Sequence, residues 1–410
     1  MQNKNEYTVT KYACYTSNIA MSVVGNLSPL LFVAFKEIYN ISYTLLGLLV
    51  VVNFFTQLLI DLIFSFFPQR FNIIKTIKTM PLITVIGLLI YAIMPTFFPQ
   101  TAYLWIVIGT IIFSVSAGLN EVLASPIIAT IPSENTDKEV SKLHSIYAWG
   151  VVLVVVVSTL FLFVFGRENW MFLALIWTSI PLTAFLLFLR AEIPPMTIVK
   201  TTKNREKIFS RGVIICIICI FLGGASEVTM AQWMSGYLEK ALAIPKIFGD
   251  VLGVAVFSVF LGLGRTLYAK KGKNVLAVMQ AGMIGATICY IVAGVSLNAF
   301  LGLFACVLTG FCVSMLWPGT IVYVSENFAS AGVAVYALMA AGGDLGASVA
   351  PQLVGVISDK LALTNFAFNL SQTLNISPEQ IAMRAGLLFS ALFPLAGILI
   401  VSILKRRNKT

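Results

Sequence analysis

The stretch Ile111–Ile131, IIFSVSAGLNEVLASPIIATI, is apolar enough to cross a membrane as a helix, yet it carries Glu121 beside Asn120 near its middle. An ionised carboxylate at the centre of a bilayer costs roughly 2.5–3.5 kcal/mol on insertion scales. A chain retains such a residue where it faces a wet cavity or a partner, or where it takes up a proton. We interpret Glu121 as the coupling site of a solute transporter; a protonated structural carboxyl that ties two helices together is the alternative.

The composition of the chain indicates a protein that crosses the bilayer many times. Of its 410 residues, 59% are hydrophobic and 11% are charged, and the mean hydropathy is +0.93. Soluble domains are about 45–50% apolar and about 25% charged, so a water-soluble globule could not bury this much apolar surface. Since a spanning helix needs about 20 apolar residues, the length suits twelve helices, short loops and one linker.

The apolar runs predict an all-α integral membrane protein with twelve transmembrane helices in two bundles of six. We expect the first bundle over residues 1–189 and the second over residues 212–410, joined by the basic linker 190–211. The N-terminal segment is polar and lacks the apolar core of a signal peptide, so the first helix is expected to direct insertion.

The second bundle has sharper local signals. We expect its fourth helix over residues 300–324, its fifth over residues 334–357 as the eleventh of the chain, and the longest outer loop over residues 358–379. Ser377 and Gln380 match a capping box with Pro378 at the first helical position, which predicts that the last helix begins there.

The distribution of basic residues predicts that both termini lie in the cytoplasm, because cytoplasmic loops carry an excess of Lys and Arg. In that orientation the outer segments hold six of the 27 basic residues: Lys36, Arg167, Lys240, Lys246, Lys360 and Arg384. The net charge of +10 then reflects topology rather than nucleic-acid binding. We expect a monomeric multi-pass protein of a cell membrane, specifically a bacterial inner membrane.

Four acidic residues are expected within the bilayer: Asp61, Glu121, Glu227 and Asp344. A carboxyl whose solvation changes between two states can load a proton on one side and release it on the other. On this basis Glu121, Glu227 and Asp344 are predicted ion-coupling residues. Structural alternatives exist: Asp61 can bind backbone or basic loop groups, and Asp344 can pair with Arg265 or with a helix terminus.

Amide and aromatic side chains on the same predicted helices are candidate solute contacts. Polar residues four apart share one face of a helix, and a polar face in a bilayer turns inward. The candidates are Asn26, Asn53, Gln57, Asn120, Tyr147, Gln232, Trp233 and Trp317. The indole rings can stack on a sugar, although tryptophan in membrane helices also serves in packing. Charged candidates for gating near the predicted inner helix ends are Asp61, Arg70 and Arg265.

The sequence contains no pattern typical of an enzyme or a cofactor site. A single histidine cannot build a His-rich metal site, and neither a Walker motif nor GxSxG is present. The six cysteines fall in apolar runs and predict no disulfide framework. We therefore expect no enzymatic activity, no cofactor, no bound metal and no ATP-driven pumping.

Several segments resemble the major facilitator superfamily. Its inner loops carry the pattern GxxxD(R/K)xGR(R/K), which Gly264–Arg265 and residues 270–273 match in part, while Gln69 replaces the aspartate of the first copy. The segments Gly118–Pro126 (GLNEVLASP) and Gly223–Leu238 (GGASEVTMAQWMSGYL) resemble helices 4 and 7 of the fucose–proton symporter family.

The resemblance continues through Leu316–Thr320 (LWPGT) and Gly342–Gly355 (GGDLGASVAPQLVG), which look like helices 10 and 11 of that family. It implies the major facilitator fold, and it places Glu121 where the family has a glutamate implicated in proton coupling. A second coupling carboxylate would be expected on helix 1, where this chain has only Asn18 and Asn26.

The leading functional prediction is alternating-access transport of a small polar solute, a monosaccharide or related metabolite, coupled to protons through Glu121. Sodium-coupled uptake and proton-coupled efflux of amphipathic compounds are the alternatives, and a non-transporting sensor is a third class. The expected partners are the solute, a proton or sodium ion, and the lipid bilayer, without nucleic acid.

Overall fold

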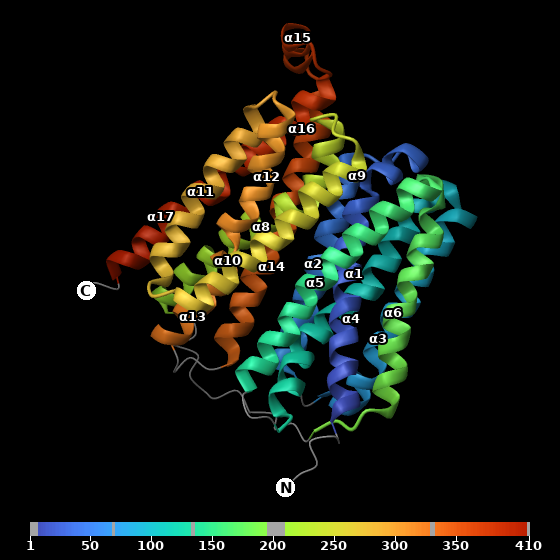
Figure 1. Cartoon of the computed structure of the whole chain (residues 1–410), viewed down its shortest axis with the longest axis vertical. Helices are drawn as coiled ribbons and strands as arrows, with labels where there is room; N and C mark the ends of the chain where they lie inside the picture. Colours follow the sequence, from blue (N-terminus) through green and yellow to red (C-terminus); the bar gives the residue numbers. More distant parts are fainter. Residues whose placement is uncertain (1–6, 68–69, 133–135, 195–209, 329–332, 408–410) are drawn as a thin grey trace. The chain divides into compact units, whose positions relative to one another are not determined.

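The computed structural model describes residues 7–67, 70–132, 136–194, 210–328 and 333–407 (Figure 1). Within these ranges the chain forms helices joined by short connections, and no strand occurs. The long apolar runs explain this, because a helix satisfies its own backbone hydrogen bonds where water is absent.

The first part of the chain contains six long helices joined by short turns, two of which are 3₁₀ helices. They are α1 (Thr8–Tyr39), α2 (Tyr43–Phe66), α3 (Ile73–Phe97), η2 (Pro99–Thr101), α4 (Ala102–Thr130), α5 (Thr136–Phe165), η3 (Arg167–Asn169) and α6 (Trp170–Arg190).

The second part is more broken, with several spans built from two or three consecutive helical pieces. They are α8 (Arg211–Lys240), α9 (Lys246–Phe248), the π-helical η4 (Gly249–Ala255), α10 (Val256–Lys271), α11 (Val275–Val295), α12 (Ala299–Val313), α13 (Leu316–Asn327), α14 (Val333–Ala362), α15 (Asn365–Leu374), α16 (Pro378–Ser390) and α17 (Leu392–Arg407).

Eleven helical stretches in the described part of the chain are long and apolar enough to cross a membrane. The predicted eleventh helix is present as α14, which carries Asp344, Ser348 and Gln352, but it is not among them. The all-α class is confirmed, whereas the number of twelve membrane helices and the cytoplasmic termini stay predictions.

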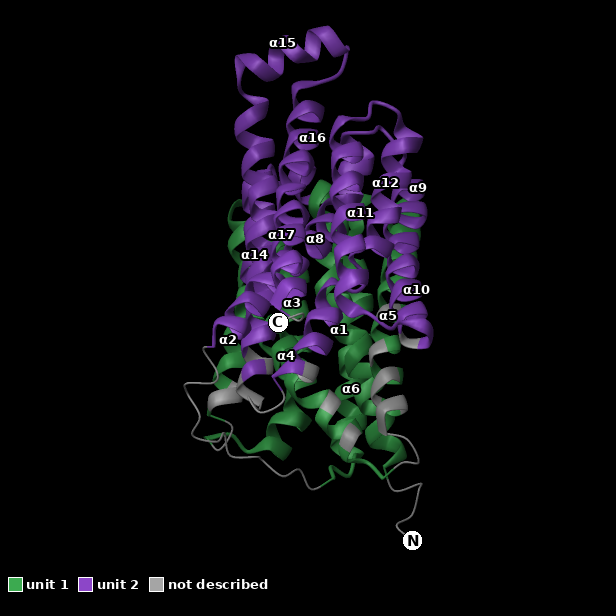
Figure 2. Ribbon diagram, turned by 90° about the vertical axis from the view of Figure 1, so that its left-hand side faces the viewer, with its two compact units in different colours: residues 1–34, 55–201 green, residues 35–54, 202–410 purple. Residues whose placement is uncertain are grey.

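The chain folds as two compact units (Figure 2). Unit 1 comprises residues 1–34 and 55–201, and unit 2 comprises residues 35–54 and 202–410. The end of α1 and the first half of α2 therefore belong to unit 2. The predicted bundle boundaries stay predictions, and most of the predicted linker, residues 195–209, lies outside the described residues.

The predicted helix over residues 300–324 is interrupted between α12 and α13. The cause is Pro318, which lacks an N–H and whose ring collides with the carbonyl four residues earlier, that of Ser314. The Ser314 carbonyl accepts a hydrogen bond from Arg265 Nε instead, at 3.1 Å. The break thus creates an acceptor for a charged side chain.

The stretch 358–379, predicted as a loop, is largely helical, so that prediction is wrong. Helix α14 continues to Ala362, and α15 follows after the Thr364 hydroxyl, which accepts from the Ala367 N–H at 3.2 Å. Within α15, apolar residues recur every four positions, as in an amphipathic helix: Phe366, Leu370 and Leu374.

The predicted capping box at the start of α16 is confirmed. The Gln380 N–H donates to the Ser377 hydroxyl at 3.1 Å, and the Ser377 N–H donates to Gln380 Oε1 at 2.9 Å. Pro378 occupies the first helical position, where no backbone donor is needed.

Unit 1 has an apolar core that fixes the position of α4. Fully buried side chains from α1, α3, α4 and α6 pack together there: Cys14, Ile77, Met80, Ile127, Ile128 and Phe188. This packing holds α4 in place, and with it the polar residues Asn120 and Glu121.

Candidate functional site

Asp61 on α2 and Glu121 on α4 form a carboxylate pair in unit 1. Their carboxylate oxygens lie within 4.8 Å of one another. Asp61 is buried, with 3% of its surface exposed, whereas Glu121 is exposed. Two carboxylates this close repel each other when both are ionised, and a bound proton or cation removes that repulsion.

Gly118 explains why α2 and α4 approach closely enough to form the carboxylate pair. A Cβ atom at Gly118 would lie 3.1 Å from the Gln57 carbonyl oxygen and 3.2 Å from Asp61 Oδ1. Small residues allow such close contact between membrane helices. A larger side chain here would push α2 away from α4 and separate the two acids.

Neither member of the carboxylate pair has a basic partner among the described residues. The ion pairs found there involve other side chains. Asp61 Oδ1 is buried and accepts no hydrogen bond from the described part of the chain. A buried carboxylate oxygen without a donor is costly unless a proton or an ion satisfies it.

A hydrogen-bond network beside the carboxylate pair joins α1, α4 and α5. Asn120 Nδ2 donates to Asn18 Oδ1 at 2.8 Å, and Asn120 Oδ1 accepts from the Ser17 hydroxyl at 2.7 Å. Asn18 Nδ2 donates to the Leu143 carbonyl at 3.0 Å. All three side chains are buried. Both ends of the Asn120 amide therefore bind α1, which holds α4 against α1 at the residue next to Glu121.

Two predicted solute contacts, Asn26 and Tyr147, are half-buried near the contact between α1 and α5. Ser22 donates to the Tyr147 carbonyl at 2.8 Å, and Asn26 Nδ2 donates to the Ser22 carbonyl at 2.9 Å. A Cβ at Gly25 would lie 3.5 Å from the Tyr147 hydroxyl. The structure thus brings the amide and the phenol to neighbouring positions.

Three polar residues of α2 recur every four positions and are buried: Asn53, Gln57 and Asp61. A spacing of four places them on one face of the helix. The boundary between the two units falls within this row, after Phe54.

Unit 2 contains the ion pair Glu227–Arg265, so the alternative that Arg265 pairs with Asp344 is not what the structure has. Arg265 Nη2 lies 3.0 Å from Glu227 Oε1 and 3.4 Å from Oε2. Glu227 is thereby held by an arginine. Asp344 is buried on α14, where its carbonyl accepts from the Ser348 hydroxyl at 2.7 Å.

The two predicted stacking tryptophans pack between helices of unit 2. Trp233 is 1% exposed, and its Nε1 donates to the Pro351 carbonyl at 2.8 Å. Trp317 lies against Gly343, and a Cβ at Gly224 would be 3.1 Å from its ring. Gln232, next to Trp233, is also buried.

Sequence reasoning missed a buried ion pair, Lys246–Asp250. Lys246 Nζ lies 2.9 Å from Asp250 Oδ2 and donates to the Ser235 hydroxyl at 2.8 Å. Asp250 is fully buried within η4. The spacing of four between a lysine and an aspartate was the available signal, since such residues meet on one face of a helix.

The first copy of the loop motif gives no gating contact in the described part of the chain. Arg70 is exposed, and its guanidinium lies 5.2 Å from the centre of the Phe67 ring. Gln69 lies outside the described residues.

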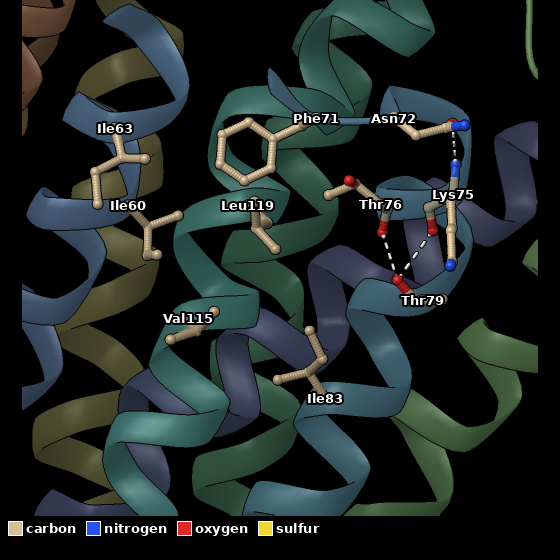
Figure 3. A pocket seen from close by; sticks show the side chains of 10 residues that line it. All are labelled: Ile60, Ile63, Phe71, Asn72, Lys75, Thr76, Thr79, Ile83, Val115 and Leu119. Carbon is tan, nitrogen blue, oxygen red and sulfur yellow. Dashed lines mark hydrogen bonds between the residues drawn. The ribbon is translucent and has the colours of Figure 1, made fainter. Parts of the chain in front are cut away.

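A pocket of about 340 Å³ lies in unit 1 between α2, α3 and α4 (Figure 3). Its lining residues are mostly apolar: Ile60, Ile63, Phe71, Asn72, Lys75, Thr76, Thr79, Ile83, Val115 and Leu119. Lys75 is the one charged residue among these ten, and none of them is a predicted site residue. We therefore do not assign the solute to this pocket.

Residues 14–351 match the family model described as Major Facilitator Superfamily. The chain belongs to this superfamily. The resemblance to the superfamily is thereby confirmed, and the protein is a multi-pass membrane protein of a transporter family rather than an enzyme. No curated protein matches the sequence significantly.

Solved transporter structures share the fold at low sequence identity. A D-xylose–proton symporter is 16% identical with a TM-score of 0.73, over 94% of this chain and 96% of that one. A bacterial homologue of the human lysosomal transporter Spinster is 14% identical with a TM-score of 0.72, over 97% and 96%. The E. coli fucose:proton symporter is 12% identical with a TM-score of 0.58, over 96% and 99%.

Proposed function

We propose that this superfamily member is a secondary transporter that moves a small polar solute by alternating access, with the carboxylate pair Asp61–Glu121 carrying the coupling proton. The supporting observation is the approach of the two carboxylates within 4.8 Å without a basic partner in the described residues. Two such groups titrate together and can share a single proton.

The different exposure of the two acids suits a proton carrier. Glu121 is exposed and can exchange a proton with water, whereas Asp61 is buried and repels a second negative charge nearby. A change in the solvation of the carboxylate pair between two states of the transporter would load and release the proton.

We propose that a monosaccharide or related metabolite contacts Asn26, Asn53, Gln57, Tyr147 and Gln232, because amide and phenol groups suit sugar hydroxyls. The similarity to xylose and fucose symporters supports this class of solute. Asn120, Trp233 and Trp317 are assigned to packing on account of their contacts.

The two remaining predicted coupling acids take different places in this proposal. Glu227, bound by Arg265, acts as a structural or gating group together with Arg265, while Asp344 stays a candidate for ion coupling because it is buried in α14. The proposed setting is a bacterial inner membrane with both termini in the cytoplasm and the protein as a monomer.

The test is uptake by purified protein in proteoliposomes, using radiolabelled D-xylose, L-fucose and uridine. With an acidic exterior, we expect at least one of them to accumulate above equilibrium and to leak out when a protonophore is added. Accumulation driven by a sodium gradient alone would overturn the proton proposal and assign sodium to the carboxylate oxygens, which are ligands for hard cations.

A further inference from the structure

The N-terminus of α2 is capped by a carboxylate from α14. The backbone N–H groups of Tyr43 and Thr44 donate to Asp359 Oδ1 at 3.1 Å and Oδ2 at 2.5 Å. The hydroxyl of the local cap, Ser42, accepts from the Leu45 N–H at the longer distance of 3.3 Å. The first N–H groups of a helix have no partner within the helix and carry partial positive charge, so a carboxylate binds them well.

The same end of α2 is held by a second carboxylate, from α16. The Tyr43 hydroxyl donates to Glu379 Oε1 at 2.7 Å. Lys36, at the end of α1, lies 3.8 Å from Glu379 Oε1, and its ammonium sits 3.9 Å from the centre of the Tyr43 ring. The turn between α1 and α2 is therefore bound to the ends of both α14 and α16.

Helices α2 and α14 also approach closely beyond the capping carboxylate. A Cβ at Gly355 would collide with the Tyr43 carbonyl, and a Cβ at Gly47 would lie 2.8 Å from Gln352 Oε1. The start of α2 thus lies against α14 over about one turn, from Tyr43 to Gly47, and Asp359 fixes its end.

We propose that Asp359 is a positioning residue of the transport cycle, whose carboxylate holds the N-terminus of α2 against α14 in this structure and releases it in the opposite state. The inference rests on the proposed function, since α2 is also the helix that carries Asp61. In this proposal, α14 influences the position of α2, the helix that carries Asp61 of the carboxylate pair.

The ion pairs around the α1–α2 turn are partly exposed, so they can separate at a small cost in free energy. Those at Lys36 and Glu379 are partly exposed, with 31% and 41% of the side chains accessible, and a further ion pair links Glu37 to Lys240 of α8 at 2.6 Å. Exposed ion pairs contribute little net stability, so their separation needs little free energy. The capping contact at Asp359 is a charge-assisted hydrogen bond to the backbone N–H groups of α2.

The test measures the distance between spin labels at Ile38 and Leu297, both exposed positions of unit 2, in a variant whose six native cysteines are replaced. Double electron–electron resonance on the parent protein should give one main distance. Asp359→Asn should add a longer component, because the amide lacks the charge that holds the α2 N-terminus. Asp359→Glu should restore part of the parent distribution.

Thr364→Ala is the matched control, because it removes the N-cap of α15 without touching α2. It should leave the distances as in the parent. A parent-like distribution in Asp359→Asn, or an equal change in Thr364→Ala, would overturn the proposal. If Asp359→Asn is not recovered folded, Glu379→Gln is used in its place. A smaller increase of the same distance is then expected, and an unchanged distance distribution would contradict the proposal.

The measurement uses no solute and no gradient, so its outcome is separate from the proposed function. Asp359→Asn could show the longer distance while the parent protein shows no proton-driven uptake. That result would support the positioning role of Asp359 and contradict only the proposed proton coupling.

Discussion

The carboxylate pair of unit 1 and two acids of unit 2, Glu227 and Asp250, have opposite kinds of partner. In unit 1, Asp61 faces Glu121 with no basic partner in the described residues, whereas in unit 2 Glu227 binds Arg265 and Asp250 binds Lys246. A basic partner keeps a carboxylate charged, while a second carboxylate favours a shared proton. Burial alone therefore does not identify a coupling site, because the charge state of an acid also depends on its partner.

Removing the acid of the largely buried ion pair Lys246–Asp250 should have the largest effect on stability. Asp250→Ala leaves the Lys246 ammonium, 12% exposed, without its counter-charge. We expect a loss of about 3–5 kcal/mol, as for other broken buried pairs. Thermal unfolding of the protein in detergent measures it. The double variant Asp250→Ala/Lys246→Met should recover much of the loss, and a single variant as stable as the parent would mean that the pair is not a buried one.

Breaking the second ion pair should cost less, because Arg265 is partly exposed. Arg265→Met removes the partner of Glu227 and the donor to the Ser314 carbonyl, and the expected loss is about 1–3 kcal/mol. The same unfolding assay applies. Adding Glu227→Gln should make the loss smaller, and an additive further loss would show that the two side chains do not act as a pair.

The half-buried ion pair Lys11–Glu139, at the start of α5, should contribute less to stability than the two pairs of unit 2. Lys11, 3.2 Å away, holds the pKa of Glu139 below its usual range. Because the folded-state pKa is lowered, the stabilisation is present above the ordinary glutamate pKa and is lost as the pH falls through the lowered value. Glu139→Gln should cost less than about 1 kcal/mol at neutral pH. The difference from the parent, followed by unfolding at stepwise lower pH, should vanish; a constant difference would contradict the assignment.

Neutralising the acid without a basic partner should have the smallest effect on stability. Asp61→Asn removes one of two repelling charges and strands no cation, so we expect a change of roughly 0–1 kcal/mol in the stabilising direction. A destabilisation comparable to that of Asp250→Ala would show that Asp61 is held by a basic group, and the contrast between the units would be lost.

The helix pattern could be predicted from sequence because it depends on local properties. The apolar runs located the long helices, and Ser377, Pro378 and Gln380 located the start of α16. The break before Pro318 was also local, but a proline within a membrane helix does not always interrupt it, because neighbouring groups can satisfy the freed carbonyl.

Partners of the site residues could not be predicted, since they depend on contacts between distant segments. Nothing in the sequence near Trp233 indicates that its Nε1 donates to the Pro351 carbonyl. Likewise, nothing near Tyr43 indicates that its N–H donates to the Asp359 carboxylate. The approach of Asp61 to Glu121 depends on Gly118, whose role becomes visible only when α2 and α4 are packed.

The most direct test of the account compares Glu121→Gln with the parent protein in proteoliposomes, using whichever test solute the parent accumulates. Glu168→Gln, which changes an exposed glutamate in η3, is the matched control. We predict that Glu121→Gln retains counterflow exchange but loses accumulation driven by a proton gradient, while Glu168→Gln keeps both. Uphill, proton-driven accumulation by Glu121→Gln at the parent's level would contradict the account.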